Sequence, residues 1–293
     1  MNFSSSFSAN LSSSGLFDGV SPTAYLLVIH GSRDPRPARS ATSVAQQVQN
    51  VLAKKSLVGV ASLECASSPL HQQIMEFSDR AIVHGCQALA IVPLFLLPGV
   101  HVRDDIPEEV ELARKAMGER LPIRCLPYLG SNPNMGAMVA RQVEREISQR
   151  DWNANGTDSS PHVILMAHGS RRTGGNHNIE AIAAQRGIVP AYWSVSPKLS
   201  EQIDKITVRD QRPVMVVPYF LFAGGITDAI ARTIEKMNHG QYLNPIVWGE
   251  PLDSNPEIVT LIVQQLTQEF FMESEQEIGQ NRQNLLLSNT LKY

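Results

Sequence analysis

The tetrapeptide His-Gly-Ser-Arg occurs twice in the chain, each time directly after an apolar run. The first copy ends the segment LLVIHGSR at residues 26–33, and the second ends VILMAHGSR at residues 163–171. His30 and His168 are therefore about one domain length apart, since domains typically span roughly 100–200 residues. The repeat indicates a duplicated domain in which an apolar strand runs into the same polar turn in each copy.

Further pairs of segments match between the two halves in the same order. The pairs are 67–74 with 195–203, 90–99 with 214–225, 123–130 with 245–252, and 129–143 with 252–266. This collinear order predicts two tandem domains joined by a polar, Gly- and Asn-containing linker. We expect a first domain at 23–150, a linker at 151–161 and a second domain at 162–273.

Short β-rich runs alternate with longer amphipathic segments within each half, which is typical of an α/β domain. In the first half they predict strands at 24–30, 58–65, 88–95 and 122–128, and helices at 38–54, 69–84, 104–118 and 133–149. Continuous apolar strands suit a parallel sheet that is covered on both faces. We therefore expect each half to be a four-stranded parallel sheet flanked by helices.

Charge and cysteine content argue against several classes of protein. The net charge is −3 and no long basic block occurs, which argues against a nucleic-acid-binding surface. Cys65, Cys86 and Cys125 form no CxxC pair, which argues against a zinc ribbon, an iron–sulfur cluster or a disulfide framework. We expect all three cysteines to behave as small buried hydrophobic residues.

The sequence contains no recognisable targeting or membrane segment. No apolar run reaches the roughly 18 residues of a membrane span. Residues 1–22 are Ser-rich and contain no Lys or Arg, which is unlike a secretory signal or a transit peptide. We predict a disordered leader at 1–22, a polar tail at 274–293 and a cytoplasmic protein that does not bind membranes.

Three candidate metal ligands follow predicted strands of the first half. His30 follows the first strand, Glu64 ends the second, and His101 lies in a predicted loop after the third. Open α/β sheets bind ligands at the carboxyl ends of their strands, and imidazole with carboxylate suits a divalent transition metal. The alternative is that each His-Gly-Ser is only a strand-to-loop turn whose histidine is hydrogen-bonded locally.

The second half lacks this set of ligands. Ile226 aligns opposite His101, and the segment AYWSVSP at 191–197, which matches the region of Glu64, contains no acidic residue. Of the three candidate ligands, only His30 has a counterpart in the second half, which is His168. We expect the second half to keep the fold without the chemistry and to contribute a wall of an interdomain cleft.

Three segments of the first half carry a family resemblance. In this order, LLVIHGSRDPR, SLECASSP and IVPLFLLPGVHVRDDIP resemble the sirohydrochlorin chelatases of the CbiX/SirB family, which belongs to the class II chelatase superfamily. The resemblance covers about residues 24–270. It is to the long form of the family, in which one chain carries two chelatase-like domains.

The resemblance implies insertion of a divalent metal into sirohydrochlorin, a carboxylate-rich tetrapyrrole, on the route to sirohaem or cobalamin. The metal-binding histidines of the family match His30 and His101, and its glutamate matches Glu64. The resemblance therefore implies that these residues bind the metal and act in catalysis. Fe²⁺ or Co²⁺ would be a substrate, and we expect no permanently bound cofactor.

Cationic side chains are expected to bind the carboxylates of such a substrate, because arginine pairs with a carboxylate through two hydrogen bonds. The candidates are Arg33, Arg36, Arg39 and Arg103 of the first half, with Arg171 and Arg172 of the second. Ser32 is a candidate hydrogen-bond donor to the same substrate. An ordinary solvated surface is the alternative interpretation of these arginines.

Two other functions compete with that of a chelatase. An α/β hydrolase would need a G-x-S-x-G elbow after a strand, and this pentapeptide does not occur in the chain. A non-catalytic carrier of metal or tetrapyrrole could use the same histidines, and multiple turnovers would distinguish the enzyme from it. We expect the tandem chain to form its cleft as a monomer, with a small-molecule tetrapyrrole as its partner.

Overall fold

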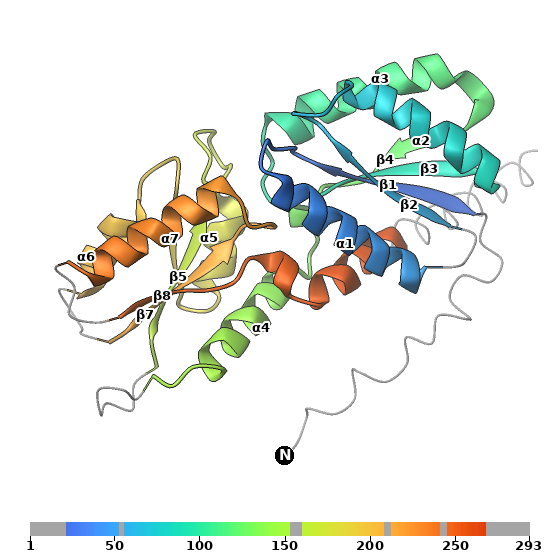
Figure 1. Ribbon diagram of the computed structural model, residues 1–293. Helices are drawn as coiled ribbons and strands as arrows, with labels where there is room; N and C mark the ends of the chain where they lie inside the picture. Colours follow the sequence, from blue (N-terminus) through green and yellow to red (C-terminus); the bar gives the residue numbers. More distant parts are fainter. Residues whose placement is uncertain (1–21, 53–55, 153–159, 208–211, 241–244, 268–293) are drawn as a thin grey trace, which may run out of the picture.

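The computed structural model describes residues 22–52, 56–152, 160–207, 212–240 and 245–267 (Figure 1). The predicted leader, except for Pro22, and the predicted tail at 274–293 lie outside these residues, as does most of the predicted linker. The limits of 23–150 and 162–273 for the two domains stay a prediction.

Two separate parallel sheets form the centre of the two halves (Figure 1). The first sheet has the order β2-β1-β3-β4 and consists of β1 (Thr23–Ile29), β2 (Leu57–Ser62), β3 (Ala88–Pro93) and β4 (Ile123–Cys125). The second has the order β6-β5-β7-β8 and consists of β5 (His162–Ala167), β6 (Val189–Tyr192), β7 (Val214–Tyr219) and β8 (Ile246–Trp248). All paired strands are parallel, which confirms the prediction of two tandem four-stranded parallel sheets.

Helices connect the strands in the same order in both halves. The first half contains α1 (Pro35–Val51), α2 (Leu70–His84), the π-helical turn η1 (His101–Asp105), α3 (Ile106–Met117), two short 3₁₀ turns and α4 (Met135–Ser148). The second contains α5 (His177–Ala184), α6 (Leu199–Thr207), α7 (Gly225–Asn238), a short 3₁₀ turn and a helix over residues 257–267, the last of the described residues.

Strand β1 occupies the middle of the first sheet and all of its residues are buried. Its side chains alternate between the two faces of the sheet. Leu26 and Val28 join the apolar cluster formed with α2 and α3, whereas Leu27 and Ile29 join the cluster formed with α1. Burial on both faces explains why this strand is a continuous apolar run in the sequence.

Local hydrogen bonds explain why two helices do not begin at their predicted residues. Helix α1 begins at Pro35, before residue 38, because the Asp34 carboxylate accepts the backbone N–H of Arg36 (2.9 Å) and proline is tolerated in the first turn. Helix α4 begins after residue 133, because the Asn132 side chain accepts the backbone N–H of Asn134 (2.9 Å) and forms a turn there.

Helix α4 packs against the second half, although its sequence belongs to the first. Its Glu146 Oε1 accepts the backbone N–H of Glu250 (3.0 Å), and its Gln142 Nε2 donates to the carbonyl oxygen of Glu250 (2.8 Å). A Cβ added at Gly136 would lie 3.4 Å from Cγ1 of Ile182 in α5. Figure 1 shows α4 below the second sheet.

The 257–267 helix makes the reciprocal contacts with the first half. Its Gln265 Nε2 donates to the carbonyl oxygen of Pro127 (2.5 Å), and its Leu261 carbonyl accepts Nδ2 of Asn132 (3.4 Å). In Figure 1 this helix lies near α1. The two halves therefore exchange their last helices, and one apolar cluster continues from β1 through α4 to β7 and Ile262.

The cysteines differ in their surroundings. Cys86 is buried, Cys125 is half-buried and Cys65 is exposed, so the expectation of burial is wrong for Cys65. Burial raises the pKa of Cys125 to about 11 and raises that of Cys86, which keeps both thiols protonated. None of the described helices combines the length and the apolar character needed to cross a membrane.

Removing apolar volume from the 257–267 helix should destabilise the chain. Ile262 is fully buried, so Ile262→Ala should lower the free energy of unfolding by about 2–5 kcal/mol, measured by urea denaturation. Leu112, which is 43% exposed on α3, gives the matched control, and Leu112→Ala should change stability by less than about 1 kcal/mol. Equal losses in the two variants would contradict the helix exchange as a core contact.

Candidate metal-binding site

The topology of the first sheet brings the ends of β1, β2 and β3 together. In the sheet, β1 pairs with β2 on one side and with β3 on the other. Successive strands are therefore added on opposite sides of β1, and the strand order reverses between β1 and β3. Open α/β sheets bind ligands at such a switch point, outside the carboxyl ends of the strands. His30 directly follows β1, and the segment after β3 leads to His101.

The structure brings the three predicted ligands into one cluster. The ring centroids of His30 and His101 lie 4.7 Å apart with the rings edge to face. Nδ1 of His30 lies 4.0 Å from Oε2 of Glu64. One ligand atom from each of the three residues lies within 4.8 Å of the others, as expected for groups that can share one metal ion. We call His30, Glu64 and His101 the donor cluster.

The turn after β1 depends on a glycine. The backbone N–H of Glu64 donates to the carbonyl oxygen of His30 (2.7 Å), which continues the β1–β2 pairing beyond the sheet. Gly31 has a φ of +92°, and a Cβ there would lie 1.8 Å from the carbonyl oxygen of Glu64. The close approach of the two backbones places the side chains of His30 and Glu64 next to each other, and only glycine permits it.

His101 lies in a helical turn and not in an open loop, so the predicted position needs correction. It is the first residue of the π-helical turn η1, which closes with a hydrogen bond from the backbone N–H of Ile106 to the carbonyl oxygen of His101. Short π-helical turns inside helices occur frequently at functional sites. The ring of Phe95 lies 6.3 Å from that of His30 and 6.2 Å from that of His101 and gives the donor cluster an apolar neighbour.

Hydrogen bonds at Nδ1 define which nitrogen of each histidine is free. Nδ1 of His101 lies 2.6 Å from Oδ2 of Asp105, and Nδ1 of His30 lies 3.1 Å from the carbonyl oxygen of Gly31. Carboxylate and carbonyl oxygens only accept hydrogen bonds, so in this arrangement Nδ1 carries the proton and Nε2 keeps its lone pair. The partner Asp105 was not singled out from the sequence, although its spacing of four residues from His101 was visible there.

The second half repeats the turn but not the donors. The backbone N–H of Ser194 donates to the carbonyl oxygen of His168 (2.8 Å), so Ser194 occupies the place of Glu64. Nδ1 of His168 lies 2.9 Å from the carbonyl oxygen of Gly169, as in the first half. Ile226 is half-buried against the apolar cluster of α6 and α7. The local hydrogen bond expected under the alternative interpretation of the histidines is present in both halves. Among the described residues, the donor cluster is present only in the first half.

Four of the predicted substrate-binding arginines are exposed, namely Arg33, Arg39, Arg103 and Arg171. Within the part of the chain that the structure describes, their guanidinium groups make no hydrogen bond or ion pair. The Ser32 hydroxyl oxygen accepts the backbone N–H of Asp34 (3.0 Å) and its own O–H remains available.

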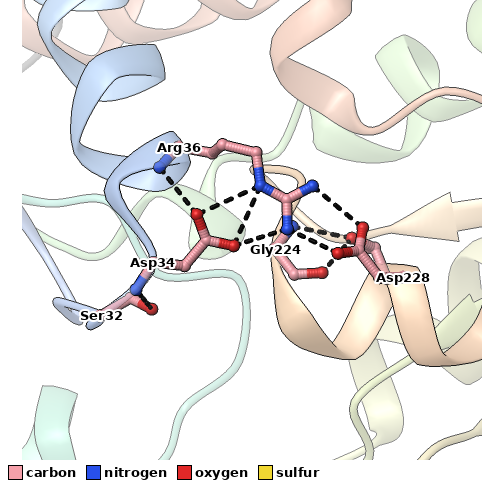
Figure 2. Close-up of polar contacts among 6 residues, drawn as sticks. Ser32, Asp34, Arg36, Gly224 and Asp228 are labelled. Atoms are coloured by element: carbon pink, nitrogen blue, oxygen red, sulfur yellow. Dashed lines mark hydrogen bonds and ion pairs between the residues drawn. The ribbon is translucent and has the colours of Figure 1, made fainter.

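Arg36 is engaged within the protein, so the structure does not support its expected role as a substrate ligand. Its Nη1 and Nη2 donate to the two carboxylate oxygens of Asp228 in α7 (3.0 and 2.6 Å), and its Nε donates to Asp34 (3.0 Å). Figure 2 shows the guanidinium between the two carboxylates, one from each half of the chain. A carboxylate from the protein thus takes the position expected for a carboxylate from a ligand.

A second ion pair joins the halves in the opposite sense. Nη2 of Arg172, in the loop after β5, lies 3.7 Å from Oδ2 of Asp104 in η1. In each case an arginine near the end of a first strand reaches an aspartate at the start of the third helical segment of the other half. Arg36 lies close in sequence to His30, and Asp104 to His101, so the two pairs lie near the donor cluster along the chain. A wall formed by the second half stays a prediction.

The fold and the donor cluster define a two-domain α/β protein with a metal-type ligand set in its first half. The model of the CbiX family matches residues 24–146 and 162–269. Both halves are thus matched, and the chain belongs to the CbiX family.

The chain is similar in sequence to curated relatives and in fold to a solved structure. The chain is 26% identical over 223 residues to a sirohydrochlorin ferrochelatase of Priestia megaterium, with 73% of this chain and 79% of the relative covered. It is 21% identical over 224 residues to a sirohydrochlorin cobaltochelatase of the same organism, with 73% and 70% covered. SirB from Bacillus subtilis with Fe³⁺ shares the fold, with a TM-score of 0.67, 19% identity and coverage of 84% of this chain and 94% of SirB.

Adding a methyl group at Gly31 should disrupt the donor cluster. We expect Gly31→Ala to displace Glu64, because the new Cβ would collide with its carbonyl oxygen, and to weaken Co²⁺ binding in a spectroscopic titration. Gly85 has a similar φ of +87° but open space around an added Cβ. Gly85→Ala should therefore lower stability by about 1–2 kcal/mol and leave Co²⁺ binding unchanged; equal binding by both variants would contradict the proposed close approach.

The Arg36 ion pairs predict a stability contribution that disappears in acid. Hydrogen bonds from Arg36 lower the pKa of Asp228 and of Asp34. A carboxylate with a lowered pKa stabilises the fold above its unfolded pKa, and the contribution is lost as pH falls through the folded value. The difference in melting temperature between the wild type and Arg36→Gln should thus be present at neutral pH, begin to shrink only below about pH 4, and be lost as the pH falls through the lowered folded pKa values of the two aspartates.

Arg33→Gln is the control, because its exposed guanidinium makes no ion pair among the described residues. It should show no such pH-dependent difference from the wild type. A difference for Arg36→Gln that persists unchanged in acid would contradict the assignment of the effect to Asp34 and Asp228.

Proposed function

We propose that this protein is a sirohydrochlorin chelatase that inserts Fe²⁺ or Co²⁺ into the tetrapyrrole. The observation that carries the proposal is the donor cluster, whose ligand atoms lie within 4.8 Å of one another at the carboxyl edge of a sheet in a CbiX-family chain. Relatives named as sirohydrochlorin ferrochelatase and cobaltochelatase support the same reaction. The metal ion is a substrate of this reaction.

The donor cluster suits an ion that must be bound and then released. Two imidazoles and one carboxylate leave coordination positions open, as catalytic metal sites require. His30 and Glu64 are each about half exposed, with 52% of the side chain accessible, so an incoming macrocycle can approach the ion. Nitrogen and carboxylate donors accept both iron and cobalt, and relatives of both specificities occur; the product would feed sirohaem or cobalamin formation accordingly.

Metal insertion must also remove two protons from the pyrrole nitrogens. The ion enters the ring as M²⁺ and two N–H protons leave, so the charge of the macrocycle is conserved. As the ion leaves the donor cluster, the imidazoles of His30 and His101 and the carboxylate of Glu64 regain free lone pairs. Imidazoles and carboxylates are common general bases in proteins, so these groups are suited to accept the protons that the ring loses.

The exposed arginines are suited to bind the substrate carboxylates. Arg33, Arg39 and Arg103 lie on segments that leave the carboxyl edge of the first sheet, and Arg171 follows β5 in the second half. Arginine binds a carboxylate through paired hydrogen bonds. Ser32 lies in the same turn as Arg33 and is suited to donate one further hydrogen bond.

Substitution of the two histidines tests the proposal. Because each supplies a donor to the ion, His30→Ala and His101→Ala should each lower the rate of metal insertion at least about 100-fold. The rate is measured from the absorbance change of the macrocycle. His168→Ala, in the matched position of the second half, should keep the rate within about twofold of the wild type. Full activity of either first-half variant would remove the assignment.

Product yield separates an enzyme from a carrier that uses the same residues. A chelatase should form many equivalents of metallated tetrapyrrole per protein chain. A carrier would bind metal and tetrapyrrole but form no more than one equivalent of metallated product per chain. That result would replace the proposal with a metal or tetrapyrrole carrier.

A further inference from the structure

We propose that Asp105 is a positioning residue for metal binding, which holds the His101 imidazole so that Nε2 faces the ion shared with His30 and Glu64. The inference rests on the proposed function of the donor cluster as a metal site. It concerns a residue outside that cluster, since Asp105 is not among the residues whose ligand atoms lie close together.

The contact between Asp105 and His101 is short and local. Oδ2 of Asp105 lies 2.6 Å from Nδ1 of His101, and both residues belong to the π-helical turn η1. Because a carboxylate can only accept, Nδ1–H of His101 is the donor. The two ring nitrogens point to different sides of the imidazole, so a proton held on Nδ1 leaves the Nε2 lone pair for the ion.

The Asp105 carboxylate has no competing task in the described part of the chain. Asp105 is the N-cap residue of α3, where an aspartate normally accepts a backbone N–H of the first turn. Here its side chain makes no capping hydrogen bond and turns back to His101 instead. The turn η1 already provides an acceptor for the first backbone N–H of α3, because the N–H of Ile106 donates to the carbonyl oxygen of His101.

The duplicated half provides an internal comparison. Pro93 of β3 and Pro218 of β7 occupy matching places, opposite Val28 and Met166. Counted from them, Ile226 matches His101, and Ile230, which is buried in the apolar cluster of the second half, matches Asp105. The half without the donor cluster has thus lost the histidine and the aspartate together, as expected for two residues that act as a unit.

The hydrogen-bond partner of His101 also differs from those of His30 and His168, the histidines of the two His-Gly-Ser turns. Nδ1 of His30 and of His168 faces a backbone carbonyl, whereas Nδ1 of His101 faces a carboxylate. A charged acceptor makes a shorter and stronger hydrogen bond, fixes the ring orientation and increases the donor strength of the opposite nitrogen. Removal of such a partner typically weakens metal binding about 10–100-fold.

Direct metal titration of the full chain tests the proposal without tetrapyrrole. We expect Asp105→Ala to weaken Co²⁺ binding about 10–100-fold relative to the wild type, measured from the visible absorption of bound Co²⁺. Asp105→Asn should lose less, because its amide oxygen still accepts Nδ1–H. Asp104→Asn is the matched control: Asp104 lies in the same turn but faces Arg172, and its loss should leave the Co²⁺ affinity unchanged.

A spectroscopic signature distinguishes positioning from a merely structural role. In the metal-free protein, ¹⁵N NMR of the histidines should show His101 with its proton on Nδ1 in the wild type and in Asp105→Asn. In Asp105→Ala this fixed tautomer should be lost while the His30 signals keep theirs. A folded Asp105→Ala variant with an unchanged tautomer and unchanged Co²⁺ affinity would overturn the inference.

The outcomes also separate this inference from the proposed function. If Co²⁺ binds and His30→Ala abolishes the binding but Asp105→Ala does not weaken it, the metal site stands and the role of Asp105 falls. If the wild type binds no Co²⁺, the proposed function fails. The tautomer of His101 in the metal-free chain still decides whether Asp105 positions its ring.

Discussion

The donor cluster depends on the backbone contact between the turns that follow β1 and β2. The hydrogen bond from the Glu64 N–H to the His30 carbonyl brings two strand ends together, and Gly31 makes the approach possible. The third donor then arrives through the connection from β3 into η1. Three residues that are distant in sequence meet because parallel strands of one sheet present their carboxyl ends at one edge.

The repeated His-Gly-Ser-Arg serves the fold in both halves and the chemistry in one. His168 makes the same local hydrogen bond as His30, and Ser170 accepts the backbone N–H of Arg172 as Ser32 accepts that of Asp34. The tetrapeptide is therefore a way of ending a buried strand. It becomes part of a metal-type site only where the neighbouring strand ends add a carboxylate and a second imidazole.

The sequence predicted the two sheets, the three donors and the loss of the third donor at Ile226, because strand ends and their polar residues follow from local patterns. It did not predict the helix exchange, since an amphipathic pattern shows that α4 buries one face but not which sheet covers it. It also missed the pairing of Arg36, because a guanidinium binds a carboxylate of the protein as readily as one of a ligand. Cys65 was expected to be buried, yet it follows Glu64 into the exposed edge of the site with a φ of +57°.

The exchange of α4 and the 257–267 helix has a consequence for how such a chain could arise. Two identical single halves that traded their last helices would form a twofold dimer with the same contacts, because each would complete the other's core. Fusion of two such copies would turn an intermolecular swap into an intramolecular one. A half expressed alone, after cleavage at the linker, would keep a helix that packs against the other half. The apolar surface exposed in this way would favour reassociation of the halves over a free monomer.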